Sequence, residues 1–532
     1  MPKVLVSDPI AKEGIELLKK CAEVDVKTGL PADELRAIIG HYDALAVRSE
    51  TKVTADILEA ATRLRIIGRA GVGVDNIDVP KATEKGIVVV NSPEGNTIAA
   101  AELTVAMLLS LARKIPHADR SIREGKWDRK SFVGSEVYDK TLGIIGLGKI
   151  GREVAKRAKS FEMKVIAYDP FANHEQASML GVELVVLEEL YRVSDFITLH
   201  VPFNSETRNM IGAPQLAMMK DGVRIINCAR GGVVDEAALV EAIKAGKVAG
   251  AAFDVYSKEP IAPDNPLRGL DAVITTPHLG ASTTEAQINV AIDIAEQIAD
   301  VLQGRQPRSA VNMPALSSEV MAEAAPYLEL GTKIGSLHTQ LARQLDGSGT
   351  PIQEMEILYQ GHFGEMPLAP ITRAVLQGLL TPMLSDPVNL VNAPTLAAAR
   401  GIRVTESHSD TAIEYNAMLT VRACLPDGCR TICGTVLSKS DIRIVHVDGY
   451  HVDIVPDGTM VFTQHIDKPG IIGAVGTLLG QNGVNIAGMN VGREKVGGRA
   501  LMVLLVDDPI TDALLRQIRA VPGMEKAQVV QL

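Results

Sequence analysis

Short apolar runs alternate with helical patterns over the first 94 residues of the chain. The runs that predict strands are residues 3–7, 44–49, 65–70 and 87–91. Between them, residues 11–20 and 54–61 show the spacing of amphipathic helices. Strands that alternate with helices form parallel sheets with crossover helices, so this part predicts an α/β domain.

A second α/β unit follows a long, mostly apolar helix expected over residues 97–113. Its predicted strands are residues 141–145, 164–168, 196–200, 224–227, 250–254 and 273–276. A helix is expected over residues 152–161, and another over residues 284–303 ends this part at Gly304, a typical helix stop. The order predicts a Rossmann-like domain.

The remaining chain changes character after residues 306–314, which contain two prolines and predict a linker. Residues 315–455 combine helical stretches with alternating strand patterns at 402–405, 417–423 and 442–447. From residue 459 the order is strand, helix, strand, strand, helix, strand, which is typical of a ferredoxin-like module.

Composition restricts the classes of function. The 532 residues carry a net charge of -10, which argues against a general nucleic-acid binder. No apolar run approaches the roughly 20 residues that span a bilayer, so no membrane partner is expected. The first residues predict a strand instead of a signal peptide, which favours a cytoplasmic protein. A presequence removed before this numbering remains the alternative.

Five cysteines are spread along the chain: Cys21, Cys228, Cys424, Cys429 and Cys433. Their spacing fits neither a disulfide framework nor a zinc ribbon, so we expect free strand thiols and no metal site.

A glycine motif follows the strand at 141–145. Gly146, Gly148 and Gly151 match G-x-G-x-x-G, in which the glycines allow a tight turn, a close approach to a pyrophosphate and close helix packing. Asp169 ends the next strand, where an acid accepts ribose hydroxyls and repels a 2′-phosphate. The motif therefore predicts NAD instead of NADP. The alternative is a structural turn with an incidental aspartate.

Three polar residues follow later strands of the same unit: Arg230, Glu259 and His278. A guanidinium binds a carboxylate with two hydrogen bonds, and an imidazole exchanges protons near neutral pH. A carboxylate beside the imidazole orients it and stabilises its protonated form. Each residue alone has a structural explanation. Together, downstream of a dinucleotide loop, they predict the oxidation of a 2-hydroxy acid.

The segments that contain these residues, 227–236, 253–260 and 276–283, resemble the signatures of the D-2-hydroxyacid dehydrogenases. Segments 68–76 and 91–96 are most similar to the long-form branch with a C-terminal ACT domain. The resemblance implies a flavodoxin-like substrate domain, a Rossmann-like NAD domain, an α+β intervening domain and an ACT regulatory domain. The corresponding residues are 1–94 with 285–314, 95–284, 315–455 and 458–532.

The resemblance also implies roles for single residues. Arg230, Glu259 and His278 would be catalytic. The implied nicotinamide contacts are Cys228, Arg230, Asp254, His278, Leu279, Gly280 and Ala281. Lys149, Ile150 and Asp169 match pyrophosphate and ribose contacts. The implied substrate contacts are Arg48, Ser49 and Asn96, with Arg129 and Lys130 reaching in from a neighbouring subunit.

The activity implied by this resemblance is NAD-dependent oxidation of 3-phosphoglycerate to 3-phosphohydroxypyruvate, the first step of L-serine biosynthesis. Asp467 and Asn485 would hold an L-serine effector between paired ACT domains of a homo-oligomer, a dimer or a tetramer. A dimerisation module without a ligand is the alternative. Rival functions are a glyoxylate, hydroxypyruvate or 2-oxoglutarate reductase of the same family and, from another class, a dinucleotide-sensing corepressor.

Overall fold

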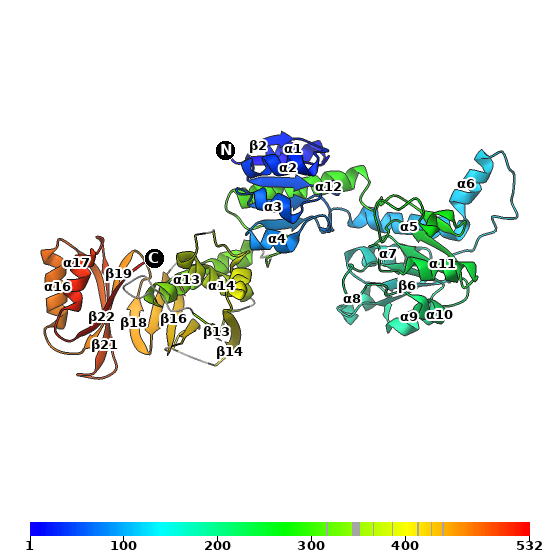
Figure 1. The fold of residues 1–532 in the computed structure, drawn as a ribbon. Helices are drawn as coiled ribbons and strands as arrows, with labels where there is room; N and C mark the ends of the chain where they lie inside the picture. Colours follow the sequence, from blue (N-terminus) through cyan, green and yellow to red (C-terminus); the bar gives the residue numbers. More distant parts are fainter. Residues whose placement is uncertain are drawn as a thin grey trace.

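The structure is a computed structural model that describes residues 1–314, 318–342, 352–364, 366–385, 387–411, 414–426, 428–438 and 441–532. Four sheets of five, seven, six and four strands organise the chain. Figure 1 shows them as successive bodies, with the first domain between the NAD-binding domain and the two C-terminal domains. Within the described residues, no helix is long and apolar enough to cross a membrane.

The first sheet is parallel and has the flavodoxin-like order β2-β1-β3-β4-β5. Its strands are β1 (Lys3–Val6), β2 (Glu23–Val26), β3 (Ala44–Val47), β4 (Ile66–Arg69) and β5 (Val88–Asn91). The helices are α1 (Lys12–Leu18), α2 (Ala32–Ile38), α3 (Ala55–Ala60), α4 (Val79–Glu84) and, from later in the chain, α12 (Thr284–Leu302). The four predicted strands are confirmed. The edge strand β2 was not predicted, because its alternation of Glu and Asp with Val gives little apolar signal.

The second sheet is also parallel and has the Rossmann-like order β12-β11-β10-β9-β6-β7-β8. Its strands are β6 (Thr141–Ile145), β7 (Lys164–Tyr168), β8 (Glu183–Leu184), β9 (Phe196–Leu199), β10 (Val223–Asn227), β11 (Val248–Phe253) and β12 (Val273–Thr275). The helices are α5 (Thr97–Arg113), α6 (Ile115–Arg123), α7 (Lys149–Ser160), α8 (His174–Met179), α9 (Leu187–Val193), α10 (Ala213–Met218) and α11 (Glu236–Lys244). All six predicted strands are confirmed, and β8 adds a short edge.

The segment predicted as a linker, residues 306–314, is held along the edge of the first sheet. The Val311 amide donates to the Val89 carbonyl at 2.7 Å, and the Asn91 amide donates to Ser309 at 3.4 Å. The Asn312 side chain accepts from the Val89 amide at 3.0 Å. The exposed edge of β5 supplies backbone partners for this segment, which therefore lies along the first sheet.

The intervening domain has a sheet of order β14-β13-β15-β16-β17-β18. Its strands are β13 (Glu354–Gly361), β14 (Arg403–Ser409), β15 (Ala417–Leu425), β16 (Gly428–Ser438), β17 (Asp441–Val447) and β18 (Tyr450–Ile454). Its helices are α13 (Ser318–Ala342), α14 (Ala369–Leu380) and α15 (Ala393–Ala399). Apolar side chains of α13 and α14 form one core with the inner face of the sheet.

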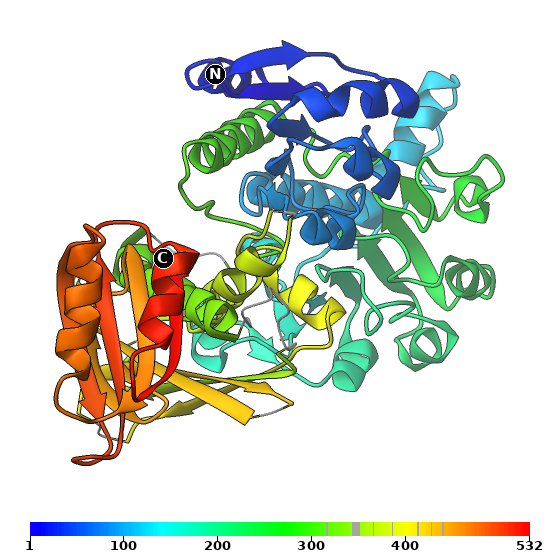
Figure 2. The same ribbon diagram turned by 60° about the vertical axis from the view of Figure 1, so that its left-hand side comes forward.

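The ACT domain has the ferredoxin-like order β20-β21-β19-β22. Its elements are β19 (Thr459–Ile466), α16 (Ile471–Gln481), β20 (Ile486–Arg493), β21 (Arg499–Val506), α17 (Asp512–Arg519) and β22 (Met524–Gln531), in the predicted order. The two helices cover one face of the sheet. The other face, including Phe462 and Val530, continues the core of the intervening domain, and Figures 1 and 2 show the two domains packed together.

Two of the five cysteines correct the expectation of free thiols. Cys424 and Cys429 are opposite each other in the β15–β16 pair, with Cα atoms 4.0 Å apart, and they form a disulfide. Cys21, Cys228 and Cys433 are free. Because β16 was not predicted, the pairing of Cys424 with Cys429 across the two strands could not be predicted either.

Close packing of α13 on α14 depends on Gly378. A Cβ atom there would collide with the carbonyl oxygen of Thr332 and lie 2.7 Å from its carbonyl carbon. We predict that Gly378→Ala destabilises this domain by about 1–3 kcal/mol because backbone must move apart. Hydrogen–deuterium exchange of α13 in the full chain measures the change. Gly480→Ala is the control, because open space surrounds that position in α16. Equal exchange in the two variants would contradict the prediction.

Candidate active site

Three adjacent parallel strands position the predicted catalytic residues. Arg230 follows β10, Glu259 follows β11 and His278 follows β12, and these strands are neighbours in the sheet. Their carboxyl ends lie at the same edge as the glycine loop after β6, where open α/β sheets bind ligands. The topology thus brings the separate motifs to one place.

Glu259 and His278 form a direct pair. The His278 Nδ1 atom lies 2.7 Å from Oε2 of Glu259. Burial raises the pKa of Glu259, but the hydrogen bond and positive charge of His278, the Tyr256 amide and Arg230 outweigh it and lower that pKa below its ordinary value. Glu259 is therefore ionised at neutral pH. An imidazole beside this carboxylate can accept a proton at its other nitrogen and hold the resulting charge.

Asp254 holds the backbone on which His278 lies. One carboxylate oxygen accepts from the Leu279 amide at 2.7 Å, and the other accepts from the Gly280 amide at 2.9 Å. The Thr276 hydroxyl donates to the first oxygen at 2.6 Å. His278 has a φ of 56°, a strained conformation for a residue with a side chain, so these bonds stabilise an unfavourable turn.

The burial of the Asp254 carboxylate and its hydrogen-bond donors indicate a structural role. Asp254 is fully buried, and burial raises its pKa despite the hydrogen bonds that favour the ionised form. Its oxygens already serve the 278–280 turn. The structure thus gives Asp254 a positioning function, and its contact with nicotinamide stays a prediction, as do those of Leu279, Gly280 and Ala281.

Local hydrogen bonds orient Arg230. The buried Asn227 side chain donates to the Arg230 carbonyl at 2.9 Å and accepts from the Ala229 amide at 3.1 Å. The Arg230 guanidinium donates to the Ala229 carbonyl at 2.7 Å, and its Nε lies 3.6 Å from the Asp75 carboxylate. Asp75 belongs to the first domain, so Arg230 lies where the two α/β domains meet.

The glycine loop fits a dinucleotide phosphate. Gly146 has a φ of 95°, and a Cβ at Gly151 would collide with the Gly146 carbonyl oxygen, so α7 packs closely on the loop. Gly148 is the N-cap of α7 and forms no side-chain cap. A Cβ atom placed on Gly148 would meet no described atom within 4 Å. The first amides of this helix are therefore free to bind an anion.

Other predicted cofactor residues surround this loop. The Asp169 carboxylate accepts from the Leu147 amide at 2.8 Å and so joins the end of β7 to the loop. Lys149, in the first turn of α7 with Ile150, forms a 2.6 Å ion pair with Glu94. Burial raises the pKa of Cys228 to about 12, so its thiol is neutral. The free helix amides, Lys149 and Asp169 are chemically suited to the phosphates and ribose of NAD.

An arginine that the sequence analysis did not select completes the positive charge of the site. Burial, followed by the charge of Arg230, lowers the pKa of Arg69 to about 10, and Arg48 contributes in the same direction. The Nε atom of Arg69 is buried, and within the residues that the structure describes it has no hydrogen-bond partner. Arg69 lies inside the segment used for the family resemblance, and its position at the end of β4 was the signal available.

The other predicted substrate residues also line the junction of the domains. The buried Asp8 carboxylate accepts from the amides of Arg48, at 2.6 Å, and Thr51, at 3.0 Å, and so shapes the loop that carries Ser49. Asn96 is the N-cap of α5, yet its buried Oδ1 atom has no hydrogen-bond partner.

Arg129 and Lys130 lie elsewhere. They are exposed on the segment after α6, which projects from the NAD-binding domain in Figure 1, away from the first domain. The structure does not bring Arg129 and Lys130 close to Arg48, Arg69 and Arg230 of the same chain. Their predicted contact with a neighbouring subunit stays a prediction.

The two predicted effector residues lie at opposite ends of the ACT sheet. Asp467 follows β19 and lies 3.4 Å from Arg493 at the end of β20. Asn485 precedes β20, and its side chain donates to Asp507 at 2.6 Å. One chain therefore does not bring Asp467 and Asn485 together.

Family models match three parts of the chain. Residues 105–280 match the NAD-binding domain of D-isomer specific 2-hydroxyacid dehydrogenases. Residues 323–448 match the D-3-phosphoglycerate dehydrogenase intervening domain, and residues 459–523 match the ACT domain.

Full-length relatives agree with these matches. The chain is 51% identical to the D-3-phosphoglycerate dehydrogenase of Synechocystis sp., over 100% of this chain and 95% of the relative. It is 49% identical to the enzyme of the same name from Archaeoglobus fulgidus, over 100% of both chains.

Among solved structures, a Thermus thermophilus protein has a TM-score of 0.54 and 34% identity, covering 58% of this chain and 99% of that one. The Aquifex aeolicus D-lactate dehydrogenase, complexed with NAD and lactic acid, has a TM-score of 0.53 and 29% identity, covering 59% and 100%.

The Glu259–His278 pair predicts a specific loss of activity. Glu259→Gln removes the carboxylate that lies 2.7 Å from His278 and stabilises the imidazolium formed during alcohol oxidation. Turnover should fall by roughly 10²-fold, within the usual range for acid–base catalysis. Steady-state rates measure the effect, with the exposed Glu241→Gln as control. Equal turnover in Glu259→Gln and Glu241→Gln would argue against the pair.

The Glu259–His278 pair, the glycine loop, the three family models and full-length identity of about half lead to one assignment. The chain belongs to the D-3-phosphoglycerate dehydrogenases of the D-2-hydroxyacid dehydrogenase family.

Proposed function

We propose that this protein oxidises 3-phosphoglycerate to 3-phosphohydroxypyruvate with NAD, the first step of L-serine biosynthesis. The observation that carries the proposal is the Glu259–His278 pair beside three arginines at the junction of two domains. The pair supplies proton transfer. The arginine cluster, defined as Arg48, Arg69 and Arg230, offers positive charge for a substrate with two anionic ends.

The residues of the Rossmann-like domain would hold NAD. The α7 amides and Lys149 would bind the pyrophosphate, and Asp169 would bind the adenosine ribose. When bound, NAD accepts the hydride from C2 of the substrate. The neutral Cys228 thiol adds no charge near the nicotinamide position implied by the family resemblance.

His278 removes the proton of the 2-hydroxyl group as the alcohol becomes a ketone. Glu259 is ionised and stabilises the imidazolium that forms. Arg230 binds the carboxylate through its planar guanidinium. Asp254 keeps the 278–280 turn in place so that the imidazole does not need to reorganise during the reaction.

Arg48 and Arg69 would bind the phosphate. Arg69 is partly buried and its Nε lacks a partner, so an incoming anion satisfies both its charge and its donor. Ser49 would contribute to this end of the site, and Asn96 would lie near the substrate carboxylate. This division of the arginines makes the phosphate, and not only the carboxylate, a determinant of substrate choice.

A second copy of the chain would complete the enzyme as a dimer or tetramer. Large apolar side chains are exposed on and after α6, among them Ile122, Trp127 and Val133. Such exposed apolar groups favour burial against a partner. Arg129 and Lys130 lie between them in sequence, so the same contact would deliver both cations to the partner's site.

L-Serine would regulate the enzyme through paired ACT domains. Because Asp467 and Asn485 lie at opposite ends of β20, a site that uses both needs one residue from each of two chains. Asp467 would bind the amino group of serine, and Asn485 its carboxylate or hydroxyl. Serine binding would thus depend on the oligomer.

We predict that His278→Ala lowers turnover by roughly 10²- to 10⁴-fold because the proton acceptor is lost. NAD affinity, measured by calorimetry, should stay within a few-fold, since the α7 amides, Lys149 and Asp169 would hold most of the cofactor. The exposed His174→Ala, in α8, is the matched control. Near-normal turnover in His278→Ala would exclude His278 as the base.

Arg69→Gln tests the substrate. The KM for 3-phosphoglycerate should rise by about 10- to 100-fold because a charge-assisted hydrogen bond is lost. The kcat/KM for unphosphorylated D-glycerate should change much less. The exposed Arg63→Gln, in the same domain, is the control. An equal loss for both substrates would instead place Arg69 at the carboxylate and contradict its role in phosphate binding.

A further inference from the structure

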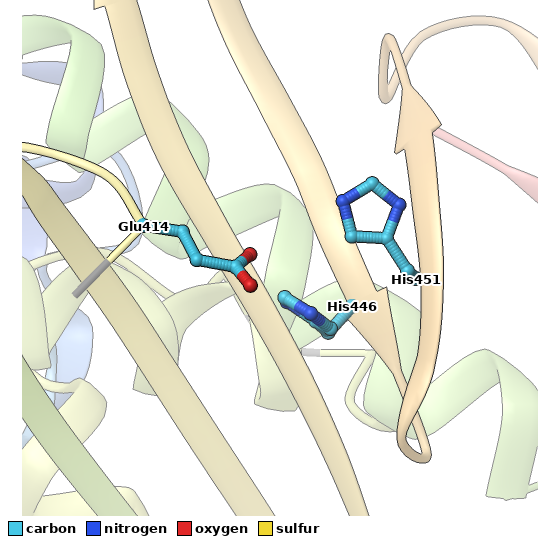
Figure 3. A group of neighbouring side chains, drawn as sticks. All are labelled: Glu414, His446 and His451. Carbon is cyan, nitrogen blue, oxygen red and sulfur yellow. The ribbon is translucent and has the colours of Figure 1, made fainter.

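Three metal-ligating side chains converge on the sheet of the intervening domain: Glu414, His446 and His451. Each offers one ligand atom, and these atoms all lie within 4.8 Å of one another. His446 on β17 and His451 on β18 are direct partners in the antiparallel pair, with ring centroids 5.2 Å apart. In Figure 3 the Glu414 carboxylate points toward the two imidazoles from the segment before β15.

Among the described residues, His446 and Glu414 have fewer polar partners than the neighbouring side chains. The Nδ1 atom of His446 is buried, and no residue of the described part of the chain forms a hydrogen bond with it. Within the described part of the chain, no salt bridge engages Glu414, whereas nearby acids on the same sheet pair with arginines. Those pairs are Arg430–Asp448, Arg443–Asp441 and Arg422–Glu356. A buried nitrogen without a partner is costly, and a cation-binding role accounts for it.

We propose that Glu414, His446 and His451 bind a divalent transition metal ion, with Zn²⁺ as the best match. Two imidazoles and one carboxylate form a common zinc ligand set, which leaves a fourth position open. Zinc ligands lie about 2.0–2.2 Å from the metal, so the three atoms must approach one another further. Rotations of the exposed Glu414 and His451 side chains supply this movement.

The position of the site suggests what bound metal does. The His451 carbonyl oxygen lies 2.5 Å from the position that a Cβ atom would take on Gly492, in β20 of the ACT domain. The same edge has contacts from the Tyr450 hydroxyl to Glu494, at 3.4 Å, and from Asn490 to the Asp453 carbonyl, at 3.3 Å. A metal that joins β17, β18 and Glu414 would therefore stiffen the strand that contacts the regulatory domain. This inference is independent of the proposed catalytic function.

Zinc titration into the chelator-treated full-length protein tests the proposal. The expected result is one tight site per chain, measured by calorimetry against a competing chelator. His451→Gln and Glu414→Gln should each weaken this binding by more than about tenfold, since even residues that only orient metal ligands contribute that much. The matched control is His408→Gln, an exposed histidine on β14 of the same sheet, and it should leave the affinity unchanged.

Two further measurements separate a site from a folding defect. Circular dichroism and NAD-dependent turnover should be the same in the variants and the unaltered protein without metal. Zinc should slow hydrogen exchange of β17 and β18 in the unaltered protein and in His408→Gln, but not in His451→Gln. Equal zinc affinity in His451→Gln and His408→Gln, or no zinc binding by the unaltered protein, would overturn the proposal.

Discussion

The buried carboxylate of Asp254 is the constraint on which the active site depends. It holds two successive amides of the 278–280 turn and a threonine hydroxyl, and so maintains a positive φ at His278. That backbone directs the imidazole to Glu259 at 2.7 Å. Without this turn, three neighbouring strand ends would supply the right residues but not their geometry. Preorganisation of this kind is what converts proximity into catalysis.

Positive charge is concentrated at the junction of the two α/β domains. The arginine cluster consists of Arg48 after β3, Arg69 at the end of β4 and Arg230 after β10. Asp75 and Asp8 are the nearby acids that influence Arg69. Like charges held together are unfavourable until an anion binds. The cluster therefore favours a doubly anionic ligand and couples its binding to the relative position of the domains. The catalytic pair lies on one side of this junction only.

Much of this organisation could be predicted from sequence. The apolar runs of β6 and β7 and the glycine loop are local signals, and they gave both the strands and the cofactor site. Features that depend on register could not be predicted. The Cys424–Cys429 bond and the Glu414, His446 and His451 group need β15, β16, β17 and β18 to be aligned. Arg69 was not predicted as a site residue because the sequence of a glycine-rich segment does not reveal whether its arginine is buried. Burial in the structure is the property that identifies Arg69.

The central claim is that the catalytic pair and the arginine cluster together select a phosphorylated 2-hydroxy acid. The most direct test is NADH production by the unaltered full-length protein with 3-phosphoglycerate, D-glycerate, D-lactate and 2-hydroxyglutarate. We predict the highest kcat/KM for 3-phosphoglycerate, by about 10²-fold or more over D-glycerate, because the phosphate is bound by charge-assisted hydrogen bonds. Equal or higher kcat/KM for an unphosphorylated acid would contradict the account.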